Sequence, residues 1–252
     1  MAGHSKWAKV KHFKGAIDAK RSKVFGKLGK EIAVAARAGG GDPSMNPRLR
    51  QVMQKCKAAN MPSDIVTRAI QRATGQIPDV IYEELMYEAF GPGGVAMLVE
   101  ITTDNKNRTA GEIRSLFTKH GGHIGGSGSV KHLFQRKGHI IVARDKAGED
   151  DLLSIALDAG ADDFQTGCEA YDLYTAPEKL EAVSKALEAK NIKPDNAELA
   201  FIPNTTVPIT SEETAQKILG LIQIIEDHDD VQNVYANFDI PDEIMSKAMA
   251  AA

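Results

Sequence analysis

The stretch ELMYEAFGPGGVAMLVEIT, residues 84–102, decides how this chain folds. Its two apolar runs, 84–90 and 95–102, are rich in residue types that favour strands, and Gly91-Pro92-Gly93-Gly94 lies between them. Glycine and proline at that place favour a tight turn, so we expect an antiparallel hairpin. A hairpin of this kind exposes apolar faces that other elements must cover.

Beyond the hairpin, helical and strand patterns alternate. We expect a helix at 107–120, a strand at 130–135 and a joint at Lys137-Gly138. The residues after the joint predict the order βαββαβ, with strands at 139–143, 163–166, 169–175 and 199–208 and helices at 150–158 and 177–190. That order is the ferredoxin-like arrangement. A last helix at 212–226 and a strand at 234–239 lack neighbours, so we expect them to return and complete the hairpin's sheet.

The residues before the hairpin predict three short helices. The start and stop signals are Gly39-Gly40-Gly41, Asn46-Pro47 and Ser63, which favour helices at 16–38, 46–59 and 63–74. Apolar residues at helical spacing predict the inward faces: Ile17, Val24, Phe25, Leu28, Ile32, Leu49, Val52, Met53, Cys56, Ile65, Val66, Ala69 and Ile70.

The sequence therefore predicts an α+β protein, with an N-terminal three-helix domain followed by two α+β domains, the ferredoxin-like one inserted in the other. We expect a basic tail and helical domain at 1–76, a discontinuous α+β domain at 77–136 plus 207–252, and the ferredoxin-like domain at 137–206. An apolar content of 42% with 26% charged residues is typical of folded proteins. Two cysteines and the lack of a long apolar run predict a cytoplasmic protein without a membrane partner.

Charge divides the chain unevenly. Residues 1–72 carry 16 Lys/Arg against 4 Asp/Glu, whereas the remaining 180 residues carry 15 against 30, for a net charge of −3. A cationic block of this density favours a polyanionic partner, and nucleic acid is the commonest one. We therefore expect the N-terminal part to contact DNA, or ribosomal RNA within the ribosome.

Cations and aromatic rings supply the candidate contacts. Lysines alternate with rings in the tail, which suits phosphates and unpaired bases, and further lysines follow one face of the first helix. The expected nucleic-acid-binding residues are Lys6, Trp7, Lys9, Lys11, His12, Phe13, Lys14, Lys20, Arg21, Lys23, Lys27, Lys30, Arg37, Arg48, Arg50, Lys55, Arg68 and Arg72. Trp7 has an alternative role as an anchor in the helical core, and the lysine face has an alternative as a solvated surface.

The residue patterns of catalysis are weak. His120 and His123 lack a third ligand nearby, Cys168 lacks a histidine partner, and the acidic run 226–230 is typical of a solvated turn. We therefore expect no catalytic residues, no cofactor and no metal, and a protein that is not an enzyme. An alternative is a ligand-binding or enzymatic α+β body, localised by the basic domain.

Five segments resemble signatures of the YebC/PmpR family. They are GHSKWAKVKHFKGAIDAKRSKVFGKLGKEI (3–32), NPRLRQVMQKCKAANMP (46–62), EAFGPGGVAMLVE (88–100), TDNKNRTAGEIRSLFTKHGG (103–122) and DDVQNVYANF (229–238). The resemblance implies three domains, an N-terminal helical one and two of α+β type. It also implies a DNA-binding transcriptional regulator, or a factor that acts at the ribosome and relieves stalling at proline-containing stretches. Both are regulators of gene expression, and we expect a monomer.

Overall fold

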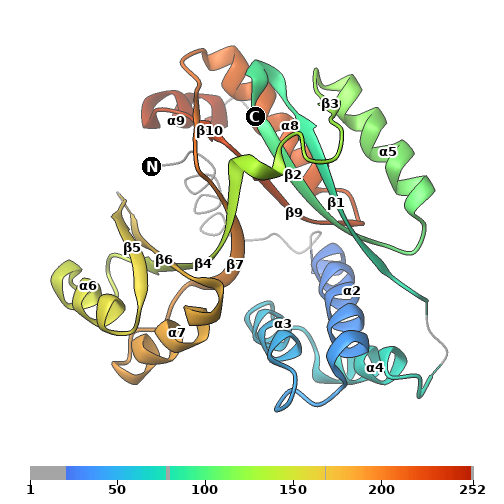
Figure 1. Ribbon diagram of the computed structural model, residues 1–252, viewed down its shortest axis with the longest axis vertical. Helices are drawn as coiled ribbons and strands as arrows, with labels where there is room; N and C mark the ends of the chain where they lie inside the picture. Colours follow the sequence, from blue (N-terminus) through green and yellow to red (C-terminus); the bar gives the residue numbers. More distant parts are fainter. Residues whose placement is uncertain (1–20, 78–79, 168, 251–252) are drawn as a thin grey trace.

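The computed structural model describes residues 21–77, 80–167 and 169–250, so the tail and the start of the first predicted helix lie outside the described residues. Three helices form the N-terminal unit (Figure 1): α2 (Arg21–Gly39), α3 (Pro47–Ala58) and α4 (Ser63–Ala73). Asn46 caps α3, accepting from the Leu49 amide at 3.1 Å and donating to the Ala35 carbonyl at 2.8 Å. One buried amide therefore starts α3 and ties it to α2.

The predicted helical core is confirmed except at its edges. Leu28, Ile32, Leu49, Val52 and Cys56 are among the buried residues that form one cluster within this unit. Val24 and Ile65, which we expected to face inward, are 36% and 37% exposed. Ser63 is the first helical residue rather than the cap, because Pro62 occupies the cap position without a side-chain hydrogen bond.

The hairpin is confirmed as β1 (Glu83–Phe90) and β2 (Ala96–Thr103), paired antiparallel from Glu83↔Thr103 to Phe90↔Ala96. It forms the centre of a four-stranded sheet of order β3-β1-β2-β9, with β3 at His123–Ile124 and β9 at Val231–Ala236. The chain therefore returns from its C-terminal part to complete this sheet, as the unpartnered last elements predicted.

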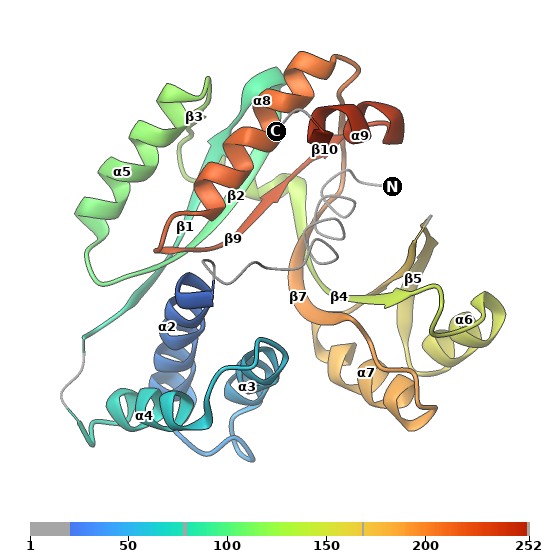
Figure 2. The same cartoon turned by 180° about the vertical axis from the view of Figure 1, so that it is seen from behind.

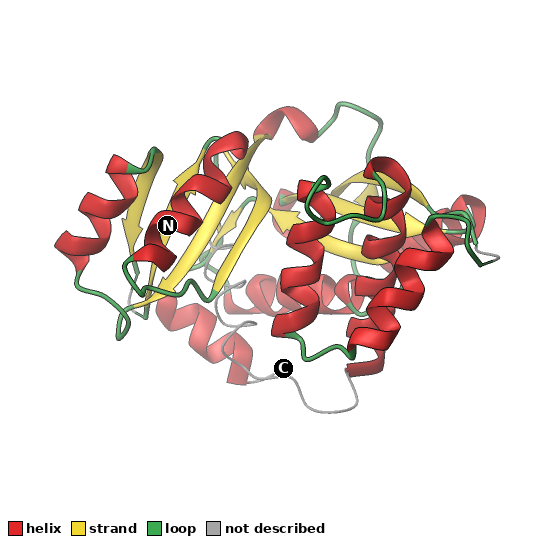
Figure 3. Ribbon diagram, turned by 90° about the horizontal axis from the view of Figure 1, so that it is seen from below, coloured by secondary structure: helices red, strands yellow, loops and turns green. Residues whose placement is uncertain are grey.

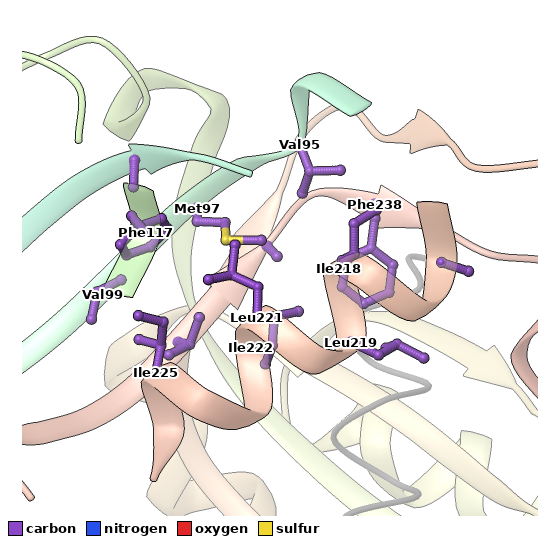
Figure 4. Packing of buried hydrophobic residues seen from close by; sticks show 14 of the residues in the cluster. Val95, Met97, Val99, Phe117, Ile218, Leu219, Leu221, Ile222, Ile225 and Phe238 are labelled. Carbon is purple, nitrogen blue, oxygen red and sulfur yellow. The ribbon is translucent and has the colours of Figure 1, made fainter. Parts of the chain in front are cut away.

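Helices α5 (Lys106–Lys119) and α8 (Glu212–Glu226) cover one face of that sheet (Figure 2). The side chains that α8 buries meet Met97, Val99 and Phe117 in a single apolar cluster, drawn close up in Figure 4. Asn105 caps α5 by accepting from the Arg108 amide at 3.1 Å, so the helix begins one residue before the expected start at 107. Burial of this apolar face is the main stabilising contribution to the unit.

The second sheet has the ferredoxin-like order. Its strands run β5-β6-β4-β7 across the sheet, all antiparallel, and the helices lie between them in the chain. The elements are β4 (Phe134–Ala143), α6 (Glu149–Asp158), β5 (Ala161–Thr166), β6 (Ala170–Thr175), α7 (Leu180–Ala189) and β7 (Asn196–Pro203). Figure 3 shows the two sheets as separate groups of strands with helices packed beside them. The α+β fold class is thus confirmed.

The expected joint at Lys137-Gly138 is wrong, because β4 runs through it. A Cβ on Gly138 would lie 2.3 Å from the Thr175 hydroxyl oxygen, so this glycine permits close strand packing. Of the strand expected at 130–135, only residues 134–135 are in a strand, the start of β4; the residues before them form a short 3-10 turn, η3 (Lys131–Leu133). The strand expected at 199–208 divides into β7 and β8 (Val207–Pro208).

Several small elements had no sequence signal. They are β3, the terminal helix α9 (Asp242–Ala250) and the 3-10 turn η2 (Pro92–Gly94). The strand expected at 234–239 divides into β9 and β10 (Phe238–Asp239), which pairs with β8, and the helix expected at 177–190 begins with the 3-10 turn η4 (Pro177–Lys179). Each sheet has its own apolar cluster, and a smaller one that includes Leu98, Phe134 and Tyr235 lies between them. The domain boundaries at 76, 136 and 206 stay predictions. Among the described helices, none has the length and apolarity needed to cross a bilayer.

Candidate nucleic-acid interface

The predicted binding residues separate into two groups. Eight of them lie outside the described residues, namely Lys6, Trp7, Lys9, Lys11, His12, Phe13, Lys14 and Lys20. The other ten lie on the three N-terminal helices: Arg21, Lys23, Lys27, Lys30 and Arg37 on α2, Arg48, Arg50 and Lys55 on α3, and Arg68 and Arg72 on α4.

Three lysines of α2 contact the end of α8 rather than solvent alone. The ammonium groups of Lys23, Lys27 and Lys30 donate to main-chain carbonyls of Asp227, Glu226 and Asp229 at 3.1, 2.6 and 3.0 Å. Carbonyls at a helix C-terminus carry the negative end of the helix dipole and lack partners within the helix. In Figures 1 and 2, α2 begins beneath the turn that joins α8 to β9.

Asp230 in that turn connects the helical unit to the first sheet. One carboxylate oxygen accepts from Lys30 at 2.5 Å, and the other accepts from Arg108 at 2.9 Å and Thr109 at 2.7 Å. Burial by itself raises the pKa of Asp230, but these hydrogen bonds outweigh it and hold the pKa well below the usual range. The carboxylate is therefore charged and fully occupied at neutral pH.

The cations of α3 also pair with acids of the rest of the chain. Arg48 makes a bidentate pair with Glu84 on β1, and Arg50 lies 3.5 Å from Glu181 on α7. Lys55 lies 3.4 Å from Glu31 and 3.6 Å from Glu198 on β7. The basic helical unit thus faces acidic groups on both sheet-containing parts.

Only part of the predicted cationic set points outward. Six of the ten are exposed, namely Arg21, Lys23, Arg37, Arg48, Arg68 and Arg72, and Arg68 lies 4.0 Å from Asp64 within α4. The charge pattern identified cations correctly as a surface feature. It did not reveal which of them bind the chain's own acids and carbonyls, because those partners are distant in sequence.

A possible ligand set for a metal lies beside this contact. Donor atoms of Glu112, His228 and Asp230 lie within 4.8 Å of one another. The His228 ring is already 3.0 Å from the Glu112 carboxylate, and both oxygens of Asp230 accept hydrogen bonds from Lys30, Arg108 or Thr109. Two cations at the same carboxylate disfavour a third positive charge, so we assign no metal to this cluster.

The described cysteine offers no nucleophile. Cys56 is buried in the helical core, and burial raises the pKa of its thiol to about 11. A thiol at that pKa is protonated at neutral pH and reacts slowly.

The fold defines a class of α+β protein in which a cationic helical unit rests on two acidic sheet-containing parts. Residues 5–76 match the model for the TACO1/YebC protein N-terminal domain, and residues 82–238 match that for the TACO1/YebC second and third domain. The chain belongs to the TACO1/YebC family, and the resemblance inferred from the sequence is confirmed.

Curated relatives agree over nearly the full length. A probable transcriptional regulatory protein of Dictyoglomus turgidum is 51% identical over 97% of this chain and 98% of its own length. A protein of Persephonella marina with the same description is 51% identical over 98% of this chain and 99% of its own length. The crystal structure of a conserved hypothetical protein from Aquifex aeolicus is 47% identical, covers 95% of this chain and 99% of its own, and has a TM-score of 0.87. The family is thus one of regulatory proteins.

Proposed function

We propose that this protein is a non-catalytic regulator of gene expression that binds nucleic acid in the cytoplasm through its N-terminal tail and helices. The observation that carries the proposal is the surplus of 16 Lys/Arg over 4 Asp/Glu in residues 1–72. The names of its relatives support control of transcription, for which the ligand is duplex DNA.

Some cations of the helical unit are exposed, and others already make hydrogen bonds to the end of α8. Arg68 and Arg72 on α4 are exposed, so phosphates reach them directly. Lys23, Lys27 and Lys30 already donate to the end of α8, so phosphate contact by these lysines replaces those hydrogen bonds. We expect nucleic acid to bind the tail and α4 first and to compete with the α8 end for α2.

A second candidate function is binding to ribosomal RNA as a translation factor that relieves stalling at proline-containing stretches. The observation that favours it is the chemistry of α2, whose polar face carries mainly lysine. Lysine binds phosphate without reading bases, whereas a duplex reader needs side chains directed at base edges. A backbone-binding surface is adequate for a structured RNA that positions the protein by shape.

One competition separates the two candidates. Labelled full-length protein is offered ribosomes and an excess of mixed genomic duplex DNA at about 0.15 M salt, and its partition is read after sedimentation. Retention on particular DNA fragments supports transcriptional control. Recovery with ribosomes supports the translation factor, and loss of that recovery on deletion of residues 1–14 assigns the contact to the tail. Binding to neither overturns the proposal.

The salt dependence and a matched pair of variants test the surface itself. For about five to eight phosphates, the log–log slope of affinity against salt is about −4 to −7. Arg68→Gln with Arg72→Gln is expected to weaken binding and reduce that slope. Lys190→Gln with Lys193→Gln removes two exposed cations beside α7 and is the control. Equal binding by the two variants would remove α4 from the interface.

A further inference from the structure

A second cationic region lies inside the acidic part of the chain. Residues 113–144 contain six Lys/Arg, four of the seven histidines and no Asp or Glu. The rest of residues 73–252 contains the other nine Lys/Arg and all thirty acids of that part. A run of 32 residues without a carboxylate, in so acidic a surrounding, favours a surface for an anionic partner.

The fold gathers the middle of this segment at one edge of the first sheet. The segment leaves the end of α5 and forms the edge strand β3. It then passes through a glycine-rich loop, residues 125–129, and enters η3 and β4. The loop is held by the buried Glu88 of β1, whose carboxylate accepts from the amides of Gly128, Val130 and Lys131 at 2.6, 2.6 and 2.8 Å. Three amides on one carboxylate make the loop a fixed feature of this edge.

The cations of this segment differ from those of α2 and α3 in their partners. Lys119, Lys131 and Arg136 are exposed, and within the described part of the chain none has a carboxylate oxygen within the 4.0 Å of an ion pair. His120, His123 and His132 are exposed between them. We call these six residues the loop-edge surface; its fixed positive charges are Lys119, Lys131 and Arg136, and Arg136 lies where the segment enters β4, opposite Phe201 of β7.

The same edge carries an exposed aromatic ring, His123, and loop glycines whose backbone has no side chain close to it. His123 stacks on Phe90 with ring centroids 5.3 Å apart and an interplanar angle of 26°, and the residue is exposed. A Cβ on Gly126 or Gly128 would meet no heavy atom within 4 Å, so the outer side of the loop is open. A Cβ on Gly122, on the inner side, would lie 2.7 Å from the Phe90 carbonyl oxygen.

We propose that the loop-edge surface is a second nucleic-acid contact that takes an unpaired strand. Lys119, Lys131 and Arg136 contact its phosphates, and a base stacks on the ring of His123, because unpaired bases stack on aromatic rings while cations follow the backbone. The bare loop at Gly126–Gly128 lets that strand approach closely. This inference rests on the proposed function and deepens it by naming the form of nucleic acid that the acidic part accepts.

Charge neutralisation tests the phosphate contacts. The full-length protein with Lys119, Lys131 and Arg136 each changed to Gln is titrated with a labelled single-stranded RNA of mixed sequence at several salt concentrations. We expect affinity to fall about tenfold and the salt slope to shrink by about two, since each phosphate contributes about 0.7 for a single strand. The control has Lys190, Lys193 and Lys247 each changed to Gln, three exposed lysines elsewhere on the acidic part.

The ring is tested separately. We expect His123→Ala to weaken single-stranded RNA about tenfold and duplex DNA of equal length less than twofold, because only an unpaired base is free to stack. His123→Phe, which keeps a ring on Phe90, should restore the affinity. Equal losses for both ligands, or no rescue by Phe, would refute the stacking contact.

The two proposals fail in different ways. If the unchanged protein binds no nucleic acid, the proposed function and this inference both fail. If it binds, and Arg68→Gln with Arg72→Gln weakens binding while the loop-edge variant matches its lysine control within twofold, only the inference fails. Photocrosslinking of thiouridine-labelled RNA to peptides within residues 113–144 of the unchanged protein supports it independently, and crosslinks confined to residues 1–76 overturn it.

Discussion

The helical unit and the loop-edge surface are both cationic, but they use their charge differently. Lys23, Lys27 and Lys30 of α2 donate to the end of α8, whereas among the described residues neither Lys131 nor Arg136 forms an ion pair within 4.0 Å, although the charge of Lys131 helps to lower the pKa of Glu88. The helical unit has the larger surplus of positive charge, but several of its cations already make hydrogen bonds within the molecule. Charge composition identifies cationic regions, but tertiary contacts decide which cations remain available to a ligand.

The largest expected effect on stability is at Asp230, because its substitution should remove the contact that distinguishes the α2 lysines from those of the loop-edge surface. Asp230→Ala leaves Lys30, Arg108 and Thr109 without their buried acceptor, so we expect the free energy of unfolding to fall by about 3 kcal/mol. Urea unfolding measures that loss. Amine-labelling rates should show Lys23 and Lys30 becoming more reactive, approaching Lys131.

Asp229→Ala is the matched control, because Asp229 contacts Lys30 through its main-chain carbonyl, which the substitution keeps, and the Asp229 side chain is exposed. It should change the free energy of unfolding by less than about 0.5 kcal/mol. If both variants behave alike, the contact between α2 and the α8–β9 turn does not restrain the helical unit.

Glu88→Gln tests how firmly the loop of the loop-edge surface is held. An amide has one acceptor oxygen and places an NH₂ against backbone donors, so we expect a loss of about 2 kcal/mol and faster amide exchange at Gly128, Val130 and Lys131. Lysine reactivity on α2 should not change. Slow exchange at those three amides in the variant would show that the loop is held by other contacts.

The same carboxylate makes a pH-dependent contribution. Burial alone raises the pKa of Glu88, but the three backbone hydrogen bonds lower it below the ordinary value. A group with a lowered folded-state pKa stabilises the fold above its unfolded pKa of about 4.3, and the contribution is lost as pH falls toward the folded value. Thermal unfolding from pH 7 to 3 should show less acid sensitivity in Glu88→Gln than in the unchanged protein.

The smallest expected effect is at the exposed pair between Arg48 and Glu84, whose side chains are 48% and 47% exposed. Glu84→Gln should lower the free energy of unfolding by no more than about 0.5 kcal/mol, since solvent screens such pairs. The difference should disappear at 1 M salt. A loss comparable with that of Asp230→Ala would mean that the pairs on α3 restrain the helical unit as strongly as the α2 contact does.

Most of the fold was predictable because its signals are local. Two apolar runs on either side of Gly91–Gly94 specify the hairpin, and the βαββαβ order follows from periods within short windows. Gly138 misled the interpretation, because its role depends on Thr175, a residue on a neighbouring strand. The two-residue strands β3 and β10 are too short to have a period.

The candidate site was less predictable. Cation spacing located the lysine face of α2, but the acceptors of those lysines are carbonyls at the end of α8, and every helix has such carbonyls whatever its sequence. The loop-edge surface has a sequence signal, the absence of acids from 113–144. Its position at one edge and its fixation by Glu88 emerge only from the pairing of β1 with β3.

The pairing of β2 with β9 sets an order for folding during synthesis. Met97 lies opposite Ala236, so the first sheet lacks a strand until nearly the whole chain has left the ribosome. The three helices and the ferredoxin-like sheet use contacts nearer in sequence and are complete earlier, and long-range strand pairs form late because loop closure opposes them. The acceptors on α8 and Asp230 emerge with that last segment. The newly made helical unit therefore spends most of synthesis without the acceptors that α8 and Asp230 provide for its α2 lysines, beside the RNA of the ribosome that is making it.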